Sequence, residues 1–175
     1  MKKLKLEELG RITPEAYKMV EKLPVVLLLD NVRSLHNVGS AFRTADAFLI
    51  EKIYLTGITG QPPHREIQKT ALGATDSVDW QHEKEGSLLV KQLKSQGYTV
   101  VIVEQTTKSI PLESFSPSHG SKYCLVFGNE VEGVSEDIIE LADLAVEIPQ
   151  SGTKHSINIS VCVGIVVWEM SKKLT

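Results

Sequence analysis

The chain has 175 residues, of which 42% are hydrophobic and 23% are charged, and its formal net charge is −3 at pH 7. This length and composition predict one soluble globular domain. The basic excess that is common in nucleic-acid-binding domains is missing, but local clustering of Lys and Arg matters more than the total charge.

Cysteine usage and the N-terminus predict a cytoplasmic protein. Cys124 and Cys162 lie in apolar runs, and neither has another Cys or a His at the spacing of zinc ligands, so we expect two buried free thiols and no metal site. The first residues, MKKLKLEELG, are charged, unlike a secretory signal. The longest apolar stretch, residues 157–170, is interrupted by polar residues and falls short of the ~20 residues of a membrane span.

In chain order, short β-branched runs alternate with amphipathic segments. Several of the runs are apolar throughout, which is typical of a parallel sheet that is covered on both faces. The alternation predicts an α/β sandwich in which crossover connections join the strands. The predicted strands are residues 25–29, 52–55, 78–81, 99–103, 123–127 and 144–148.

Three helices are predicted between these strands. The first follows residues 25–29 and presents one apolar stripe. A second helical pattern around residues 88–93 ends before Gly97, and a third begins at Ser135, which precedes two acidic residues. The positions of the first stripe are Val38, Ala41, Phe42, Ala45 and Leu49.

The segment from Ile157 to Val163 has two interpretations. Its residues alternate between apolar and polar side chains and are rich in β-branched types, which favours a strand. The continuation to Met170 is also compatible with a helix. From periodicity alone we predict a strand.

Two common nucleotide-binding signatures are missing from the sequence. No G-x-x-x-x-G-K-[ST] pattern occurs, and the first predicted strand continues into Asp30-Asn-Val-Arg rather than G-x-G-x-x-G. A bound cofactor must therefore use other loops of the sheet.

The first candidate segment is Asn37-Val-Gly-Ser-Ala-Phe-Arg43-Thr-Ala. In a helix of 3.6 residues per turn, Arg43 lies roughly 140° from Val38, so it points away from the core and is free to meet an anion such as a phosphate. The alternative is an ordinary i, i+3 ion pair with Asp46, and the residues alone favour neither interpretation.

Two further segments follow predicted strands. Residues 126–133 run into a polar turn whose glycines let the backbone approach a ligand, although an ordinary acidic surface loop has the same composition. Residues 148–158 contain Gly152 and place Ser156 where it can cap the next element, so that free N–H groups face a carboxylate or phosphate. The alternative there is a capped connection without a ligand.

Taken together, the order and spacing of these segments resemble the three signature motifs of the SpoU (TrmH) branch of the SPOUT methyltransferase superfamily. The resemblance covers about residues 25–170. The matching residues are Asn37, Gly39, Arg43, Thr44, Gly128, Asn129, Glu130, Gly133, Ile148, Pro149, Gln150, Gly152, Ser156, Asn158 and Ser160, with Ile157 where the family has Leu.

The resemblance implies a fold and an assembly. The family's fold is a mostly parallel α/β sheet between helices whose C-terminal part is threaded into a deep trefoil knot, an exception to the rule that chains avoid knots. It makes residues 1–175 a single domain without an added RNA-binding domain, and the segment after Ser156 a helix. It also implies a homodimer that packs through the N- and C-terminal helices. Apolar positions that can supply this seam, although core packing explains them as well, are Val161, Ile165, Trp168 and Leu174.

The activity that the resemblance implies is S-adenosylmethionine-dependent methylation of a ribose 2'-hydroxyl in RNA. By position, Gly128, Ile148 and Ile157 are the main expected cofactor contacts. The neighbouring contacts that the resemblance implies are Thr106, Phe127, Asn129, Gln150 and Ser156.

The family assigns Arg43 to the reacting hydroxyl and its neighbouring phosphate. Methyl transfer is an in-line displacement that needs alignment and stabilisation of a developing alkoxide. Because a guanidinium has a pKa above ~12, we expect Arg43 to stabilise this charge rather than to act as a base. Glu130, Ser156 and Asn158 would organise the catalytic pocket.

The expected substrate is a guanosine of tRNA rather than rRNA, because residues 103–110 and 147–150 resemble tRNA-guanosine 2'-O-methyltransferases. Without a basic extension, the RNA contacts must come from the core dimer. Two alternatives remain, namely a non-catalytic RNA-binding paralogue and a methyltransferase that acts on a small molecule. The residues expected to contact RNA are Asn37, Arg43, Arg65, Lys69 and Lys154, with His155 beside them.

Overall fold

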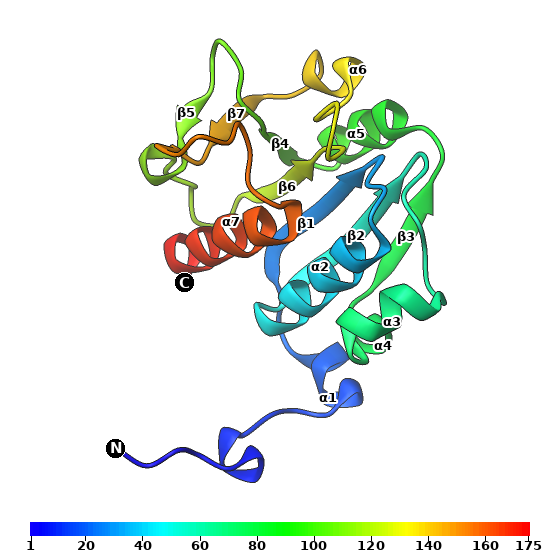
Figure 1. Ribbon diagram of the computed structural model, residues 1–175, viewed down its shortest axis with the longest axis vertical. Coiled ribbons are helices and arrows are strands. Elements are labelled where there is room, and N and C mark those ends of the chain that lie inside the picture. The colour runs from blue at the N-terminus through cyan, green and yellow to red at the C-terminus, as the bar shows by residue number, and fades with distance from the viewer.

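Seven parallel strands form one sheet, and helices pack on both of its faces (Figure 1). The computed structural model describes residues 1–175, except for the side chains of Leu6 and Glu7. In space the strands follow the order β3-β2-β1-β6-β4-β7-β5. The strands are β1 Leu23–Asp30, β2 Ile50–Thr56, β3 Trp80–Glu83, β4 Tyr98–Val103, β5 Ile110–Pro111, β6 Lys122–Phe127 and β7 Leu144–Glu147.

Helices connect these strands and cover two separate apolar clusters. Helices α2, α3 and α7 contribute to the cluster on one face of the sheet, and α5 packs on the other face. The helices are α1 Pro14–Met19, α2 Leu35–Ala47, α3 Arg65–Ala71, α4 Ala74–Ser77, α5 Gly86–Ser95, α6 Glu136–Ile139 and α7 Ile159–Leu174, with 3-10 turns η1 Leu6–Leu9 and η2 Leu112–Ser114. None of the helices that the structure describes is long and apolar enough to cross a membrane.

The predicted α/β class is confirmed, and each of the six predicted runs contains a strand. The third strand begins at Trp80 rather than Val78, because Val78 ends helix α4 through an N–H bond to the Ala74 carbonyl. Strand β5 was not predicted, since two residues are too few to show a pattern. The three predicted helices correspond to α2, α5 and α6.

The prediction of a strand over residues 157–163 is wrong, because helix α7 begins at Ile159. The Asn158 side chain accepts a hydrogen bond from Ser160 N at 2.8 Å and caps the helix. Val163, Val166 and Met170 are buried, and this helical spacing aims one face of α7 at the core. Packing of that face outweighs the β propensity of the branched residues.

Both cysteines are free, as predicted, but they differ in burial. Cys124 is buried in β6, and Cys162 is half-buried in α7. Burial raises the pKa of both thiols to about 12. Neither thiol is therefore a reactive nucleophile near neutral pH.

The parallel arrangement brings several strand ends to one edge of the sheet. Strand β6 pairs with β1 on one side and with β4 on the other, and β7 pairs with β4. All four strands run in the same direction, so the loops that follow them emerge together. Two of the three motif segments follow β6 and β7, and the third begins the helix after β1.

Gly39 of the first motif has a packing role. Helix α2 crosses α3 so closely that a Cβ atom at position 39 would overlap the Ile67 carbonyl oxygen and Thr70 Oγ1. Thr70 Oγ1 in turn donates to the His36 carbonyl at 3.0 Å, which ties the two helices together. Glycine is thus required by the approach of two backbones.

We expect Gly39→Ala to lower the free energy of unfolding by about 1–3 kcal/mol, because the added methyl group has no space between α2 and α3. Gly152→Ala in an exposed loop is the control, since nothing lies within 4 Å of a Cβ there. It should change the free energy of unfolding by less than about 0.5 kcal/mol. Urea unfolding followed by circular dichroism measures both, and equal effects of the two substitutions would contradict the packing role.

Candidate functional site

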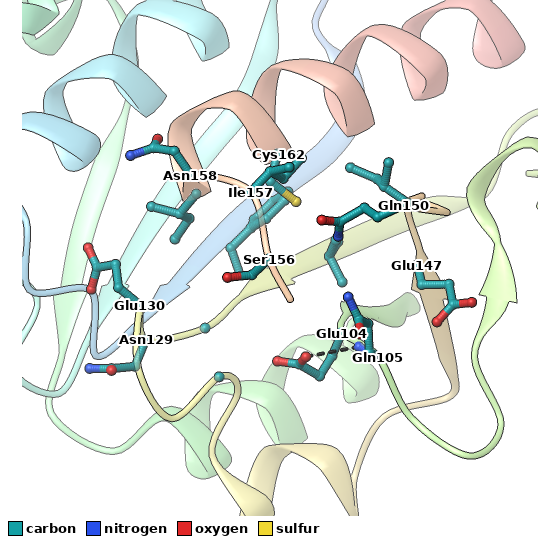
Figure 2. Close-up of a pocket in the computed structure, with 16 residues that line it drawn as sticks. Glu104, Gln105, Asn129, Glu130, Glu147, Gln150, Ser156, Ile157, Asn158 and Cys162 are labelled. Carbon is teal, nitrogen blue, oxygen red and sulfur yellow. Dashed lines mark hydrogen bonds between the residues drawn. The ribbon is translucent and has the colours of Figure 1, made fainter. Parts of the chain in front are cut away.

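A pocket of about 300 Å³ opens where β4, β6 and β7 end and α7 begins (Figure 2). Its wall combines side chains from all three strand ends with the first turn of α7. Every residue predicted as a cofactor contact lines this pocket except Thr106, which lies in the loop after β4. The structure thus gathers the second and third motif segments around one cavity.

The loop after β6 is shaped by two glycines. Asn129 and Gly133 exchange backbone hydrogen bonds of 2.8 and 3.0 Å, so the loop folds back on itself. A Cβ at Gly128 would overlap the backbone of Gly133 and Val134, and Gly133 has a φ of 73°. A residue with a side chain at either of these two positions would therefore force the turn open.

Asn129 organises the interior of the same loop. Its Oδ1 accepts bonds from Val131 N at 2.8 Å and Glu132 N at 3.2 Å. Its Nδ2 donates to the Asn31 carbonyl at 2.8 Å, just beyond the end of β1. The pocket wall after β6 is consequently fixed to the segment that leads into α2.

Glu130 joins this loop to the start of α2. Its carboxylate accepts bonds from Arg33 N at 3.0 Å, Ser34 N at 3.0 Å and Asn37 Nδ2 at 3.1 Å. Partial burial acts to raise the pKa of Glu130, but these hydrogen bonds outweigh burial and hold the pKa below its ordinary value. The carboxylate thus acts as an anchor for N–H groups.

Asn37 connects all three motif segments. Its Nδ2 donates to Glu130, and its Oδ1 accepts a bond from Asn158 Nδ2 at 3.2 Å. Asn158 also caps α7, so one amide bridge holds the first turn of α2, the loop after β6 and the first turn of α7. The prediction that Ser156 caps the next element is wrong, because Asn158 is the cap of α7 and Ser156 lines the pocket before it.

Arg43 lies outside this pocket. It is exposed on α2, in an open hollow that also contains Lys69 and Phe48. The alternative ion pair with Asp46 does not occur among the described side chains, since Asp46 instead accepts a bond from Ser77 Oγ. The guanidinium is thus exposed and available, but it does not face the pocket of its own chain.

The other residues expected to contact RNA are dispersed. Lys69 pairs with Glu66 at 2.7 Å, and Glu66 also contacts His36 at 2.8 Å, so the charge of Lys69 is partly compensated. Arg65 and Lys154 are exposed on separate segments. The loop that carries Lys154 is held by a bond from Gln105 Nε2 to the His155 carbonyl at 3.0 Å.

Sequence reasoning missed several polar groups of the pocket. Glu104 and Gln105 follow β4, Glu147 ends β7, and Cys162 lies one turn into α7. Both glutamates stand where a buried parallel strand ends, a position that often carries ligand-binding groups. That signal was present in the sequence. Among the described side chains, no cluster of His, Cys, Asp and Glu could hold a metal ion.

Comparisons with known proteins agree on one family. The model of the SpoU rRNA Methylase family matches residues 24–168. The chain is 28% identical over 169 residues to a tRNA (guanosine(18)-2'-O)-methyltransferase of Borreliella burgdorferi, covering 93% of this chain and 76% of that protein.

Two solved structures share the fold. The A. aeolicus TrmH/SpoU tRNA modifying enzyme superposes with a TM-score of 0.80 at 26% identity, covering 91% of this chain and 79% of that one. The AdoMet-bound rRNA methyltransferase of Sinorhizobium meliloti superposes with a TM-score of 0.81 at 24% identity, covering 94% of this chain and 62% of that longer chain. At that identity the second likeness is one of fold.

The lowered pKa of Glu130 predicts a pH-dependent contribution to stability. This contribution is fully present above the unfolded-state pKa of about 4.3 and is lost as the pH falls through the lower folded-state pKa. We expect Glu130→Gln to lower the free energy of unfolding by about 1–2 kcal/mol at pH 7, because one amide oxygen must serve three donors.

Urea unfolding at pH 7 and at pH 3.5 tests this expectation, and the difference between wild type and variant should shrink at the lower pH. Glu132→Gln is the control, because its carboxylate lies in the same loop and has no hydrogen-bond partner among the described residues. If the two variants are equally stable at pH 7, Glu130 is not an anchor.

Proposed function

The chain belongs to the SpoU rRNA methylase family, and we propose that it methylates a ribose 2'-hydroxyl of RNA with S-adenosylmethionine as the donor. The observation that supports this most is the amide bridge from Asn37 to Glu130 and Asn158, which assembles all three motif segments beside one pocket. The proposal treats residues 1–175 as one methyltransferase domain.

The pocket fits the proposed donor in size and chemistry. Its volume of about 300 Å³ lies at the lower end of the range for small-molecule sites. Phe127, Ile148 and Ile157 provide apolar contacts for an adenine ring, while backbone groups of Gly128 and Ile148 lie at the strand ends. The described residues that line the pocket include three carboxylates and no Lys or Arg, which suits a cationic ligand better than a phosphate-rich one.

S-adenosylmethionine, when bound, would supply a methyl group on a positively charged sulfur. The residues of this chain have three tasks beside it. Gly128 and Gly133 keep the loop after β6 close to the pocket, Asn158 fixes the first turn of α7, and Ser156 offers a hydroxyl at the pocket edge. These groups hold the donor in place and orient the acceptor.

Arg43 is the proposed catalytic cation. Its guanidinium is a fixed positive charge that would bind the phosphate next to the acceptor ribose and stabilise the alkoxide that develops on the 2'-oxygen. The proton of the hydroxyl passes to phosphate or solvent, because the guanidinium cannot accept it. Arg43 does not line the pocket of its own chain. A complete site therefore needs another molecule that brings an Arg43 side chain to the pocket.

We propose that this molecule is a second copy of the chain. Three apolar side chains on the outer face of α7 are exposed, namely Val161 (52%), Ile165 (39%) and Trp168 (55%). Leu174 belongs with the core cluster instead. In α1, Met19 is 87% exposed, so the N-terminal segment offers apolar surface to the same homodimer.

A two-fold axis near Ile165 would complete the site. In an antiparallel contact between two copies of α7, the C-terminal half of one helix lies beside the N-terminal half of the other. The Phe48 ring contacts Trp168 at 5.9 Å and shares the hollow of Arg43, while Ile159 and Cys162 line the pocket. The contact thus carries Arg43 of the partner subunit toward this pocket.

We propose that the C-terminal segment is knotted, as the family resemblance implies. Lys173 Nζ donates to the carbonyls of Glu113 at 2.9 Å and Phe115 at 2.6 Å, and Gln105 binds the His155 carbonyl. The connection from β4 to β6 therefore contacts both the loop before α7 and the last turn of α7, as the proposed threading requires. An electron-density trace of residues 104–175 with the tail outside this connection would contradict the knot.

The proposed acceptor is a guanosine ribose of tRNA. The likeness to the Borreliella burgdorferi tRNA (guanosine(18)-2'-O)-methyltransferase supports tRNA, while the match to the SpoU rRNA Methylase family keeps rRNA as the second candidate. Asn37, Arg65, Lys69 and Lys154 would contribute to RNA binding around Arg43. Their contacts should make binding strongly dependent on salt.

Incubation of the protein with labelled donor and total tRNA or rRNA, followed by nuclease mapping, tests the activity. We expect label on a tRNA guanosine, and Arg43→Ala should reduce methylation by roughly 100-fold or more while donor affinity stays within twofold, because the cation acts on the acceptor. Donor binding without label on any RNA would favour a small-molecule acceptor. RNA binding without donor binding would indicate a non-catalytic paralogue.

Mixed dimers test whether Arg43 acts across the interface. The Arg43→Ala subunit keeps an open pocket but lacks the guanidinium. The Ile157→Trp subunit keeps Arg43, but the indole ring fills its own pocket. Random mixing of the two variants should restore about a quarter of wild-type activity, since half of the dimers are mixed and each has one complete site. No activity above that of the separate variants, or a monomeric protein in sedimentation, would contradict the two-chain site.

A further inference from the structure

The Glu104 carboxylate lines the pocket but has no role in the proposed mechanism. Glu104 follows β4, and its carboxylate lies beside Gly133 in the turn after β6 (Figure 2 shows Glu104 among the lining residues). A Cβ at Gly133 would overlap its Oε2, so the glycine leaves the space that the carboxylate fills. The absence of a side chain at Gly133 therefore allows the Glu104 carboxylate to take this position.

The Glu104 carboxylate is held but not neutralised. Its Oε1 accepts a bond from Gln105 N at 2.9 Å, and its Oε2 accepts one from Val134 N at 3.2 Å. No Lys, Arg or His pairs with it among the described side chains. Each oxygen keeps a free lone pair, so the group can still interact with a ligand.

The other two carboxylates of the pocket are also held by hydrogen bonds. Glu130 accepts three N–H bonds from the start of α2, and Glu147 accepts a bond from Ser109 Oγ at 2.9 Å. Neither has a cationic partner among the described residues. The pocket is consequently negative, and Glu104 is the half-buried carboxylate that packs against the turn after β6.

We propose that the Glu104 carboxylate makes this pocket select the cationic sulfonium donor over its neutral thioether product. The inference rests on the proposed function. In the reaction the bond from sulfur to the methyl carbon breaks, its electron pair stays on sulfur, the 2'-oxygen bonds the methyl group, and the hydroxyl proton leaves to phosphate or solvent. The positive charge in the pocket disappears, so the attraction to Glu104 is lost and the product is released more readily.

Titration calorimetry with three ligands tests the selection. S-adenosylmethionine and sinefungin are cationic at the reacting position, and S-adenosylhomocysteine is neutral there. In Glu104→Gln, the ratio of the Kd of S-adenosylhomocysteine to that of S-adenosylmethionine should fall by roughly threefold to tenfold relative to wild type. Sinefungin should lose affinity in parallel with S-adenosylmethionine, because it keeps the charge without the sulfonium methyl group.

A ratio of two constants from one sample does not depend on the folded fraction of that sample, so partial unfolding of the variant cannot imitate the effect. Glu132→Gln removes an equal charge from the loop after β6, at a residue that does not line the pocket, and should leave the ratio unchanged. Equal weakening of all three ligands in Glu104→Gln would overturn the inference. Glu104 would then interact with the adenosine or amino-acid groups, which the donor and the product share. Failure of wild type to bind any of them would overturn the proposed function as well.

Discussion

Two hydrogen bonds of one amide side chain hold the candidate site together. Asn37 donates to Glu130 at 3.1 Å and accepts from Asn158 at 3.2 Å, so three segments that are far apart in sequence meet at the first turn of α2. Glu130 also binds the backbone N–H groups of Arg33 and Ser34, and Asn158 caps α7. Two walls of the pocket, the loop after β6 and the segment before α7, are thus both held against α2.

These hydrogen bonds can form because glycines allow backbone segments to approach each other closely. Gly39 lets α2 lie against α3, and Gly128 lets the loop after β6 turn back on Gly133. Gly133 in turn leaves room for the Glu104 carboxylate, which lines the pocket. The motif glycines therefore act through the geometry of the chain, while the chemistry belongs to the amides, the carboxylates and Arg43.

Much of the fold could be predicted from the residues, and the failures have physical causes. Apolar runs such as residues 123–127 are buried strands whose type is set by local composition. Residues 157–163 were misjudged because the core contacts of Val163 and Val166, which no periodicity reveals, outweigh β propensity. Glu104 and Glu147 meet in one pocket because β4 and β7 are neighbours in the sheet, which the local sequence pattern does not reveal. The place of Arg43 depends on the crossing of α2 and α7, which the local pattern does not reveal either.

The central claim is that the pocket held by the Asn37 bridge is the donor site. A crystal structure of the protein grown with S-adenosylmethionine tests it most directly. The account predicts donor density between the ends of β6 and β7, in contact with Gly128 and Ile148, with the bonds of Asn37 to Glu130 and Asn158 intact. Donor density in another part of the molecule, or loops after β6 and β7 that lie apart around an empty space, would contradict it.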